Sequence, residues 1–238
     1  MRIIAFFVAA ALLGAGGASA ADLAPRAVEP AAPVYLPFTW TGFYAGANIG
    51  ADFSTSKFTD MPAGNGLPWN AIGDTFSPDR TGFTGGIQAG YNWQMSHFVL
   101  GAEADFGYLG GTGTASSNLT PLTVGHIGTG YYGTLRARAG FAVDRLLIFA
   151  TAGGIVADQA AYMSDTGLTA TSKTGAQGGW TAGGGVEYAF TDNWTVKLDA
   201  LYYDLGSKTV NDGNAVSGPT FRIKNSGELV RLGINYKF

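Results

Sequence analysis

The sequence predicts an all-β protein, an eight-stranded antiparallel β-barrel that spans a membrane. Three observations predict this fold class. Apolar and polar residues alternate with period two in one segment after another. Aromatic residues gather at both ends of the apolar faces, as two membrane–water interfaces select. Only 13% of the 238 residues are charged, whereas soluble domains carry about 25%, so an ordinary water-exposed surface would be hard to cover.

Composition also excludes several classes of protein. A chain with 13% aromatic residues is not disordered. The absence of cysteine excludes a disulfide scaffold, a thiolate zinc site and a cysteine nucleophile. A net charge of −3 argues against nucleic acid as a partner. No metal-ligand cluster or phosphate-binding loop stands out, so we expect no metal and no cofactor.

The N-terminus predicts export. Arg2 precedes an apolar stretch, and the small residues Ala18 and Ala20 fit the cleavage pattern of a secretory signal peptide over residues 1–20. An uncleaved anchor is the alternative, although the apolar stretch is shorter than the roughly 20 residues that span a bilayer. Residues 21–39 contain four prolines and read as an extended periplasmic linker. The barrel is predicted over residues 40–238.

Eight segments are predicted strands: 40–53, 81–95, 98–108, 127–141, 146–157, 180–190, 194–203 and 230–238. The apolar faces end in aromatic residues: Phe43 and Phe53, Phe83 and Trp93, Phe98 and Tyr108, Tyr131 and Phe141, Trp180 and Phe190, Trp194 and Tyr202, and Tyr236. The segment 146–157 alternates poorly, and its faces cannot be assigned. An even number of strands suits a closed barrel with both termini on one side.

A soluble β-sandwich is the alternative to a membrane barrel. Its apolar faces would be dense in Val, Ile and Leu, and its opposite faces would carry many charges. Here the apolar faces carry alanine and glycine between the aromatic ends, and the opposite faces carry glycine and few charges. That pattern is typical of a narrow barrel interior rather than of a solvated exterior.

Connector lengths predict the orientation. The links near 95–97, 142–145 and 191–193 are short, and those near 54–79, 110–126, 158–176 and 206–220 are long. Short turns lie on the periplasmic side of such barrels and long loops lie outside the cell. Both termini would then be periplasmic, and the protein would reside in the outer membrane of a Gram-negative bacterium.

The polar faces place eight charged residues at similar heights above the short turns. They are Glu103, Asp105, Arg136, Arg138, Glu187, Lys197, Asp199 and Arg231. An eight-stranded barrel of OmpA or OmpX size is just wide enough inside for side chains to fill. Four cations against four anions predict cross-strand ion pairs that plug the interior. A narrow passive channel for small solutes, lined by the same residues, is the second hypothesis.

The long connection 54–79 is unusually apolar for an exposed loop. Phe58, Trp69 and Phe76 lie in it and would form either a lid over the barrel mouth or a binding patch.

Catalysis is the third hypothesis, since small outer-membrane barrels include lipid-modifying enzymes. Such an enzyme needs a base, usually histidine, beside a serine or a water. His97 lies in a predicted short turn. His126 lies at the outer rim near Ser116 and Ser117, but proximity in a loop is no evidence of a triad. We therefore predict no catalytic residues and no enzyme.

Several motifs resemble one family of proteins. They are Trp40-Thr41-Gly42-Phe43-Tyr44, Thr191-Asp192-Asn193-Trp194, Tyr202-Tyr203-Asp204-Leu205-Gly206 and the ending Val230 to Phe238. From Trp40 to Phe238 the chain is similar to the small outer-membrane barrels of alphaproteobacteria, often described as opacity-type or porin-family proteins. The resemblance implies a barrel that supports envelope integrity and surface contacts, surrounded by outer-membrane lipid and lipopolysaccharide.

The resemblance also implies two partners. Tyr236 and Phe238 are similar to the terminal signal that the barrel-assembly machinery recognises, although a last strand facing lipid would look the same. In some relatives a mature N-terminus that begins alanine-aspartate is joined to peptidoglycan. Ala21 and Asp22 match that start, and a flexible linker is the alternative.

Overall fold

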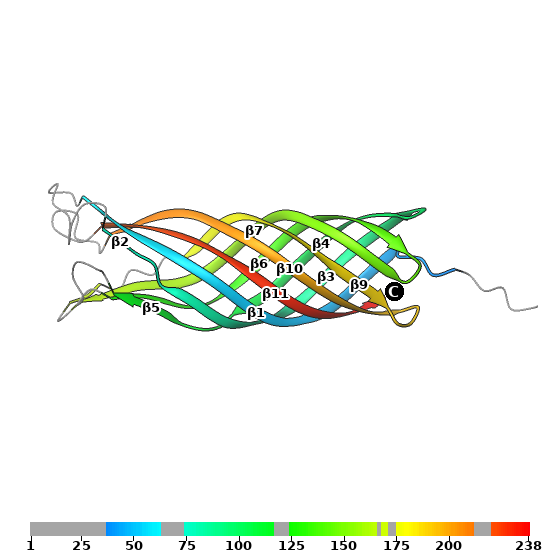
Figure 1. The fold of residues 1–238 in the computed structure, drawn as a ribbon, viewed down its shortest axis with the longest axis horizontal. Helices are drawn as coiled ribbons and strands as arrows, with labels where there is room; N and C mark the ends of the chain where they lie inside the picture. The colour runs from blue at the N-terminus through cyan, green and yellow to red at the C-terminus, as the bar shows by residue number, and fades with distance from the viewer. Residues whose placement is uncertain (1–36, 63–73, 117–123, 166–167, 171–174, 212–219) are drawn as a thin grey trace, which may run out of the picture. The chain divides into compact units, whose positions relative to one another are not determined.

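Eight long strands make up the fold (Figure 1). They are β1 (Gly42–Met61), β3 (Asp79–Met95), β4 (Phe98–Leu109), β6 (Val124–Val143), β7 (Leu146–Asp165), β9 (Ala176–Ala189), β10 (Trp194–Asn211) and β11 (Thr220–Lys237). The short strands β2 (Thr75–Phe76), β5 (Gly113–Ser116) and β8 (Leu168–Ala170) extend the sheet beside β1, β6 and β7. This computed structural model describes residues 37–62, 74–116, 124–165, 168–170, 175–211 and 220–238.

The sheet closes on itself. Each long strand pairs antiparallel with the next along the chain, and β11 returns to pair with β1 from Lys237 opposite Tyr44 to Thr220 opposite Met61. The predicted eight-stranded antiparallel barrel is therefore confirmed. None of the residues that the structure describes forms a helix capable of crossing a membrane.

The alternation of faces follows the prediction in the seven strands where it could be assigned. Large apolar side chains point outward, such as Phe43, which is 66% exposed, while its neighbour Tyr44 is buried inside the barrel. Strand β7 is apolar on both faces, with Ile148 and Val156 outside and Leu147, Phe149 and Ile155 inside. Because the interior beside β7 is itself apolar, that strand shows no clear period-two pattern.

The strands run further than predicted. The expectation of long connections is wrong for the following residues, which lie in strands: 54–61, 75–76, 79, 113–116, 124–126, 158–165, 168–170, 176, 206–211 and 220. Between Phe53 and Met61, β1 stays paired with β11. The outward residues there, Thr55 and Lys57, are polar, so this extension gives no hydrophobic signal. Phe58 consequently is a buried strand residue and not part of a loop.

The two rims of the barrel differ. Turns at 96–97, 144–145 and 190–193 form what we call the short-turn rim. The first residue of each two-residue turn has a positive φ, 56° at Ser96 and 49° at Asp144, as hairpin turns that match the strand twist require. The opposite end, which carries the other connections, is the long-connection rim.

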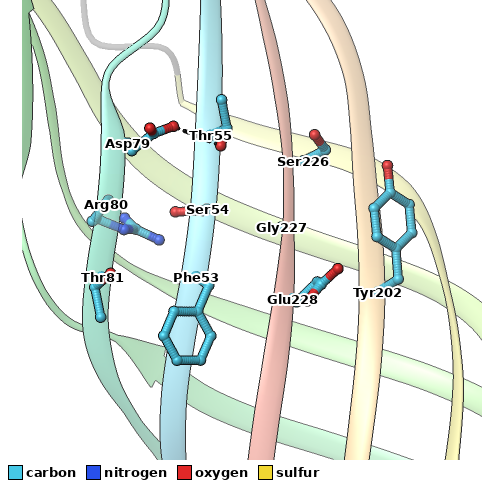
Figure 2. Close-up of a pocket in the computed structure, with 10 residues that line it drawn as sticks. All are labelled: Phe53, Ser54, Thr55, Asp79, Arg80, Thr81, Tyr202, Ser226, Gly227 and Glu228. Carbon is cyan, nitrogen blue, oxygen red and sulfur yellow. Dashed lines mark hydrogen bonds between the residues drawn. The ribbon is translucent and has the colours of Figure 1, made fainter.

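The outer surface carries two rings of exposed aromatic side chains, one toward each rim, made of the residues expected there. A groove of about 370 Å³ crosses the outer surface at the long-connection end, over β3, β1, β11 and β10 (Figure 2). Its outward-pointing lining residues are Phe53, Thr55, Asp79, Thr81, Tyr202, Ser226 and Glu228.

Candidate functional site in the barrel interior

The interior is built in layers, and the order of inward residues along single strands defines them. Along β4, Val99 lies nearest the short-turn rim, Glu103 and Asp105 follow, and Leu109 comes last. Along β10, Lys197 and Asp199 are followed by Leu201. A charged layer thus lies between two apolar layers.

The lower apolar layer lies toward the short-turn end. It consists of Trp40, Val99, Ala142, Leu147, Phe149 and Ala189. Trp40 precedes β1, and its side chain is only 1% exposed. The Trp40 backbone N–H donates to Gln94 Oε1 at 2.7 Å, and its indole Nε1 donates to the Asp144 carbonyl at 3.3 Å. The Phe38 ring packs edge-on against Trp40 with centroids 5.2 Å apart.

The eight predicted charged residues of the interior are brought together in the charged layer. Arg136 Nη2 lies 2.5 Å from Glu103 Oε1 and also contacts Asp105. Arg231 bridges Asp105 at 3.0 Å and Asp199 at 2.7 Å. All five side chains are at most 3% exposed.

Two further contacts cross between strands that are not neighbours. Lys197 Nζ on β10 reaches Glu103 Oε2 on β4 at 2.9 Å. Arg138 Nη2 on β6 reaches Glu187 Oε2 on β9 at 2.8 Å. Longer contacts of 3.6 Å join Arg138 to Glu103 and Lys197 to Asp199. The eight residues therefore form one connected network across the barrel.

Uncharged groups satisfy much of the remaining hydrogen-bonding capacity of this network. The Tyr44 hydroxyl donates to Glu103 at 2.7 Å and accepts from Arg138 at 2.9 Å. Thr195 and Asn235 both donate to Glu187, at 2.6 and 2.8 Å. Removing one partner from such a buried ion pair strands the other charge and costs about 3–5 kcal/mol.

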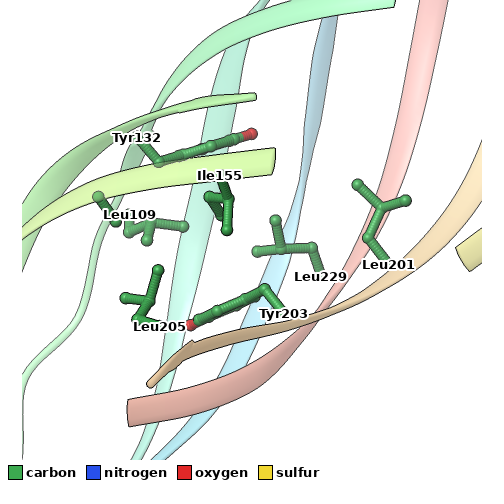
Figure 3. Packing of buried hydrophobic residues seen from close by; sticks show 8 residues of the cluster. Leu109, Tyr132, Ile155, Leu201, Tyr203, Leu205 and Leu229 are labelled. Carbon is green, nitrogen blue, oxygen red and sulfur yellow. The ribbon is translucent and has the colours of Figure 1, made fainter. Parts of the chain in front are cut away.

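The upper apolar layer lies on the far side of the charges, and Figure 3 shows it. Its members are Leu109, Tyr132, Ile155, Ala157, Leu201, Tyr203, Leu205 and Leu229. Two contacts tie the apolar layers to the network. The Tyr132 hydroxyl accepts from Arg231 at 3.3 Å, and the Arg138 guanidinium lies 4.2 Å from the ring centre of Phe149 in the lower layer.

A further buried ion pair, outside the network and not predicted from the sequence, joins Arg80 to Asp52 nearer the long-connection rim. Both side chains are fully buried, and the Tyr203 hydroxyl donates to Asp52 at 2.9 Å. A signal was available, because Asp52 lies on the polar face of 40–53 and Arg80 continues the polar face of 81–95 by one residue. Trp40 was also missed, since it was taken as the start of a strand.

Three interior tyrosines each lie across a glycine of an adjacent strand. A Cβ atom added to Gly90 would lie 2.4 Å from the Tyr44 hydroxyl oxygen. The same close approach occurs between Tyr132 and Gly107 and between Tyr203 and Gly227. These glycines are therefore required by the side chains that cover them.

Other predicted sites lie apart from this interior. His97 is in a turn, with its Nδ1 3.1 Å from the Ser96 hydroxyl. His126 is in β6 opposite Thr114, and Ser116 is opposite Val124. Tyr236 and Phe238 point outward at the short-turn rim. Phe76 is in β2 opposite Phe58.

Several predicted residues lie outside the part of the chain that the structure describes: Ala18, Ala20, Ala21, Asp22, Trp69 and Ser117. Within the described part, no group of three or more metal-ligating side chains occurs.

The closed barrel, the two aromatic rings and the polar interior define the class of an outer-membrane β-barrel protein. The family model described as outer membrane protein beta-barrel domain matches residues 8–238 of the sequence. The chain therefore belongs to this family. It resides in the outer membrane of a Gram-negative bacterium.

Named relatives agree with this class. The chain is 36% identical over 238 residues to a 31 kDa outer-membrane immunogenic protein of Brucella melitensis, covering 96% of both chains. It is 32% identical over 211 residues to a 22 kDa outer membrane protein of Rhizobium leguminosarum, covering 87% of this chain and 82% of the relative. Among solved structures, OprG of Pseudomonas aeruginosa shares the fold with a TM-score of 0.55 at 11% identity, covering 84% and 98%.

Proposed function

We propose that this protein is a structural outer-membrane barrel with a closed interior, which supports envelope integrity and carries surface interactions on its long connections. The observation that supports a closed interior is the charged network enclosed between two apolar layers. An ion or solute would have to pass two constrictions rich in buried apolar side chains and break the buried ion pairs that lie between and beside them.

The partners follow from the ends of the chain and the outer surface. The long connections face the cell exterior, and the short-turn rim faces the periplasm with both termini. Tyr236 and Phe238 form the signal read by the barrel-assembly machinery, and Ala21 and Asp22 form the attachment point to peptidoglycan. The function includes no catalytic step, which agrees with relatives that are named as outer-membrane immunogenic proteins.

Conductance of the refolded mature protein in a planar bilayer tests the closed interior. Heat-modified gel mobility first confirms that the barrel is folded. We expect no discrete conductance steps from the unmodified protein. Step-like openings would overturn the proposal and favour the narrow channel.

Two arginine variants establish whether any current passes through the interior. Arg136→Ala removes a guanidinium from the charged layer, while Arg145→Ala removes an exposed one that pairs with Asp192 at the short-turn rim. Steps that grow in R136A and stay unchanged in R145A would identify the interior as an open path.

A further inference from the structure

The outer surface concentrates positive charge at one place. Of the 14 lysine and arginine residues, Arg2, Arg26 and Lys173 lie outside the described part of the chain. Arg80, Arg136, Arg138, Lys197 and Arg231 are buried in the interior. Of the others, three share one outward patch on β1 and β11 near the long-connection rim: Lys57, Arg222 and Lys224, which we call the basic cluster.

The register brings the basic cluster together. Lys57 lies directly opposite Lys224. Arg222, which precedes Lys224 by two residues on β11, lies opposite Thr59. Directly opposed side chains have Cβ atoms about 5 Å apart, and diagonal neighbours about 7–8 Å. All three side chains are exposed. A phosphate group could therefore contact all three cations at once.

The basic cluster carries an excess of positive charge. Like charges placed opposite each other destabilise a sheet. Lys224 lies 3.4 Å from Asp204, whereas Lys57 and Arg222 form no ion pair with any carboxylate in the described ranges. This arrangement favours an anion bound from outside the protein.

Its height matches the headgroup layer of a membrane. Phe53, on the same face of β1 as Lys57, belongs to the aromatic ring near this rim and is 46% exposed. Lys57 follows Phe53 by four residues, which corresponds to about 13 Å of strand. With strands tilted by about 35–45°, the cations lie roughly 10 Å beyond the aromatic ring. Lysine and arginine side chains can reach anionic headgroups from there.

Polar groups fill the space between the aromatic ring and the basic cluster. The groove in Figure 2 offers the hydroxyls of Thr55, Thr81, Ser226 and Tyr202 and the carboxylates of Asp79 and Glu228. The Thr55 hydroxyl donates to Asp79 at 2.8 Å. Hydroxyl and carboxylate groups beside aromatic rings are suited to binding a sugar. From the membrane outward, the surface therefore presents aromatic rings, sugar-binding groups and then cations.

We propose that this surface of β3, β1, β11 and β10 binds a phosphorylated glycolipid of the outer leaflet. Acyl chains lie against the aromatic ring, sugar hydroxyls occupy the groove, and a phosphate contacts Lys57, Arg222 and Lys224. The assignment to the outer leaflet rests on the proposed orientation, with the long connections outside. Each cation near an anionic membrane surface strengthens binding about fivefold.

Native mass spectrometry of the refolded mature protein in detergent tests this site. The probes are bis-phosphorylated lipid A, its dephosphorylated form, phosphatidylglycerol and inorganic phosphate. The double variant Lys57→Gln with Lys224→Gln removes two cations of the cluster. The matched control, Lys208→Gln with Arg145→Gln, removes two exposed cations that lie outside the cluster. Lys208 is paired with inward-facing Ile223 and therefore is not on the outward face of the sheet, and Arg145 is in a turn.

We expect phosphorylated lipid A to bind about thirtyfold more weakly to K57Q/K224Q and unchanged to K208Q/R145Q. Dephosphorylated lipid A should bind the unmodified protein as weakly as phosphorylated lipid A binds K57Q/K224Q. Equal affinity of K57Q/K224Q and K208Q/R145Q for phosphorylated lipid A would overturn the proposed site. Equal binding of phosphatidylglycerol, or displacement of lipid A by millimolar phosphate, would overturn its assignment to a glycolipid. Because none of these results depends on conductance, failure here is distinguishable from failure of the closed interior.

Discussion

Single residues decide how the interior of this barrel is filled. Tyr44 lies flat across Gly90 while its hydroxyl joins Glu103 to Arg138. A buried ion pair in a low-dielectric interior stabilises the fold only when its remaining hydrogen-bonding groups also have partners. Glycine on the neighbouring strand gives the tyrosine room to reach that position, so packing and charge neutralisation depend on the same contact.

A single methyl group at Gly90 should therefore be costly. We expect Gly90→Ala to destabilise the barrel by about 1–3 kcal/mol, because the new Cβ overlaps the Tyr44 hydroxyl and displaces it from the network. Gly154→Ala is the matched control, since Gly154 faces outward and its added Cβ meets nothing closer than 4.0 Å. Urea unfolding followed by tryptophan fluorescence measures both. Equal unfolding midpoints for the two variants would contradict this account.

Strands β1 and β11 extend well beyond the apolar band. Their pairing continues from Phe53 opposite Glu228 to Met61 opposite Thr220. We expect the amide hydrogens of residues 54–60 to exchange slowly with solvent, because ladder hydrogen bonds protect them. Hydrogen–deuterium exchange of the folded protein measures this, with the turn 96–97 as an unprotected reference. Exchange of 54–60 at the rate of that turn would show that the strand ends near Phe53.

The strand ends also show which features a sequence can reveal. Seven strands had assignable faces because each one separates lipid from a polar interior, which yields a period of two. In β7 that contrast vanishes, since Leu147, Phe149 and Ile155 fill the apolar layers. Beyond Phe53 the outward residues Thr55 and Lys57 of β1 are polar, so the pattern again gives no boundary.

The candidate site was predictable to the same extent. Eight charges could be placed inside because the period of two fixes which face each one occupies. Their partners could not be predicted in full, since Lys197 reaches Glu103 and Arg138 reaches Glu187 across the barrel rather than between neighbouring strands. Trp40 precedes the first strand, where no periodicity indicates that its indole turns into the barrel.

Over the whole molecule, charge is divided between two environments that differ in dielectric constant. Ten charged side chains pair inside the barrel: Asp52, Arg80, Glu103, Asp105, Arg136, Arg138, Glu187, Lys197, Asp199 and Arg231. The basic cluster lies outside, in contact with water and headgroups. The first population stabilises the fold, and the second is available for binding.

Salt should separate these two populations. Raising NaCl from 0.1 to 1 M shortens the Debye screening length from about 10 Å to about 3 Å. The added salt therefore weakens the interactions of exposed charges far more than those of buried pairs. We therefore expect the urea midpoint to stay nearly constant while lipid A binding falls. The K57Q/K224Q variant should show a weaker salt dependence of binding than K208Q/R145Q, because it has lost the cations that are screened. A midpoint that fell as steeply as binding would mean that water and ions reach the interior network, and the interior would then be open to solvent.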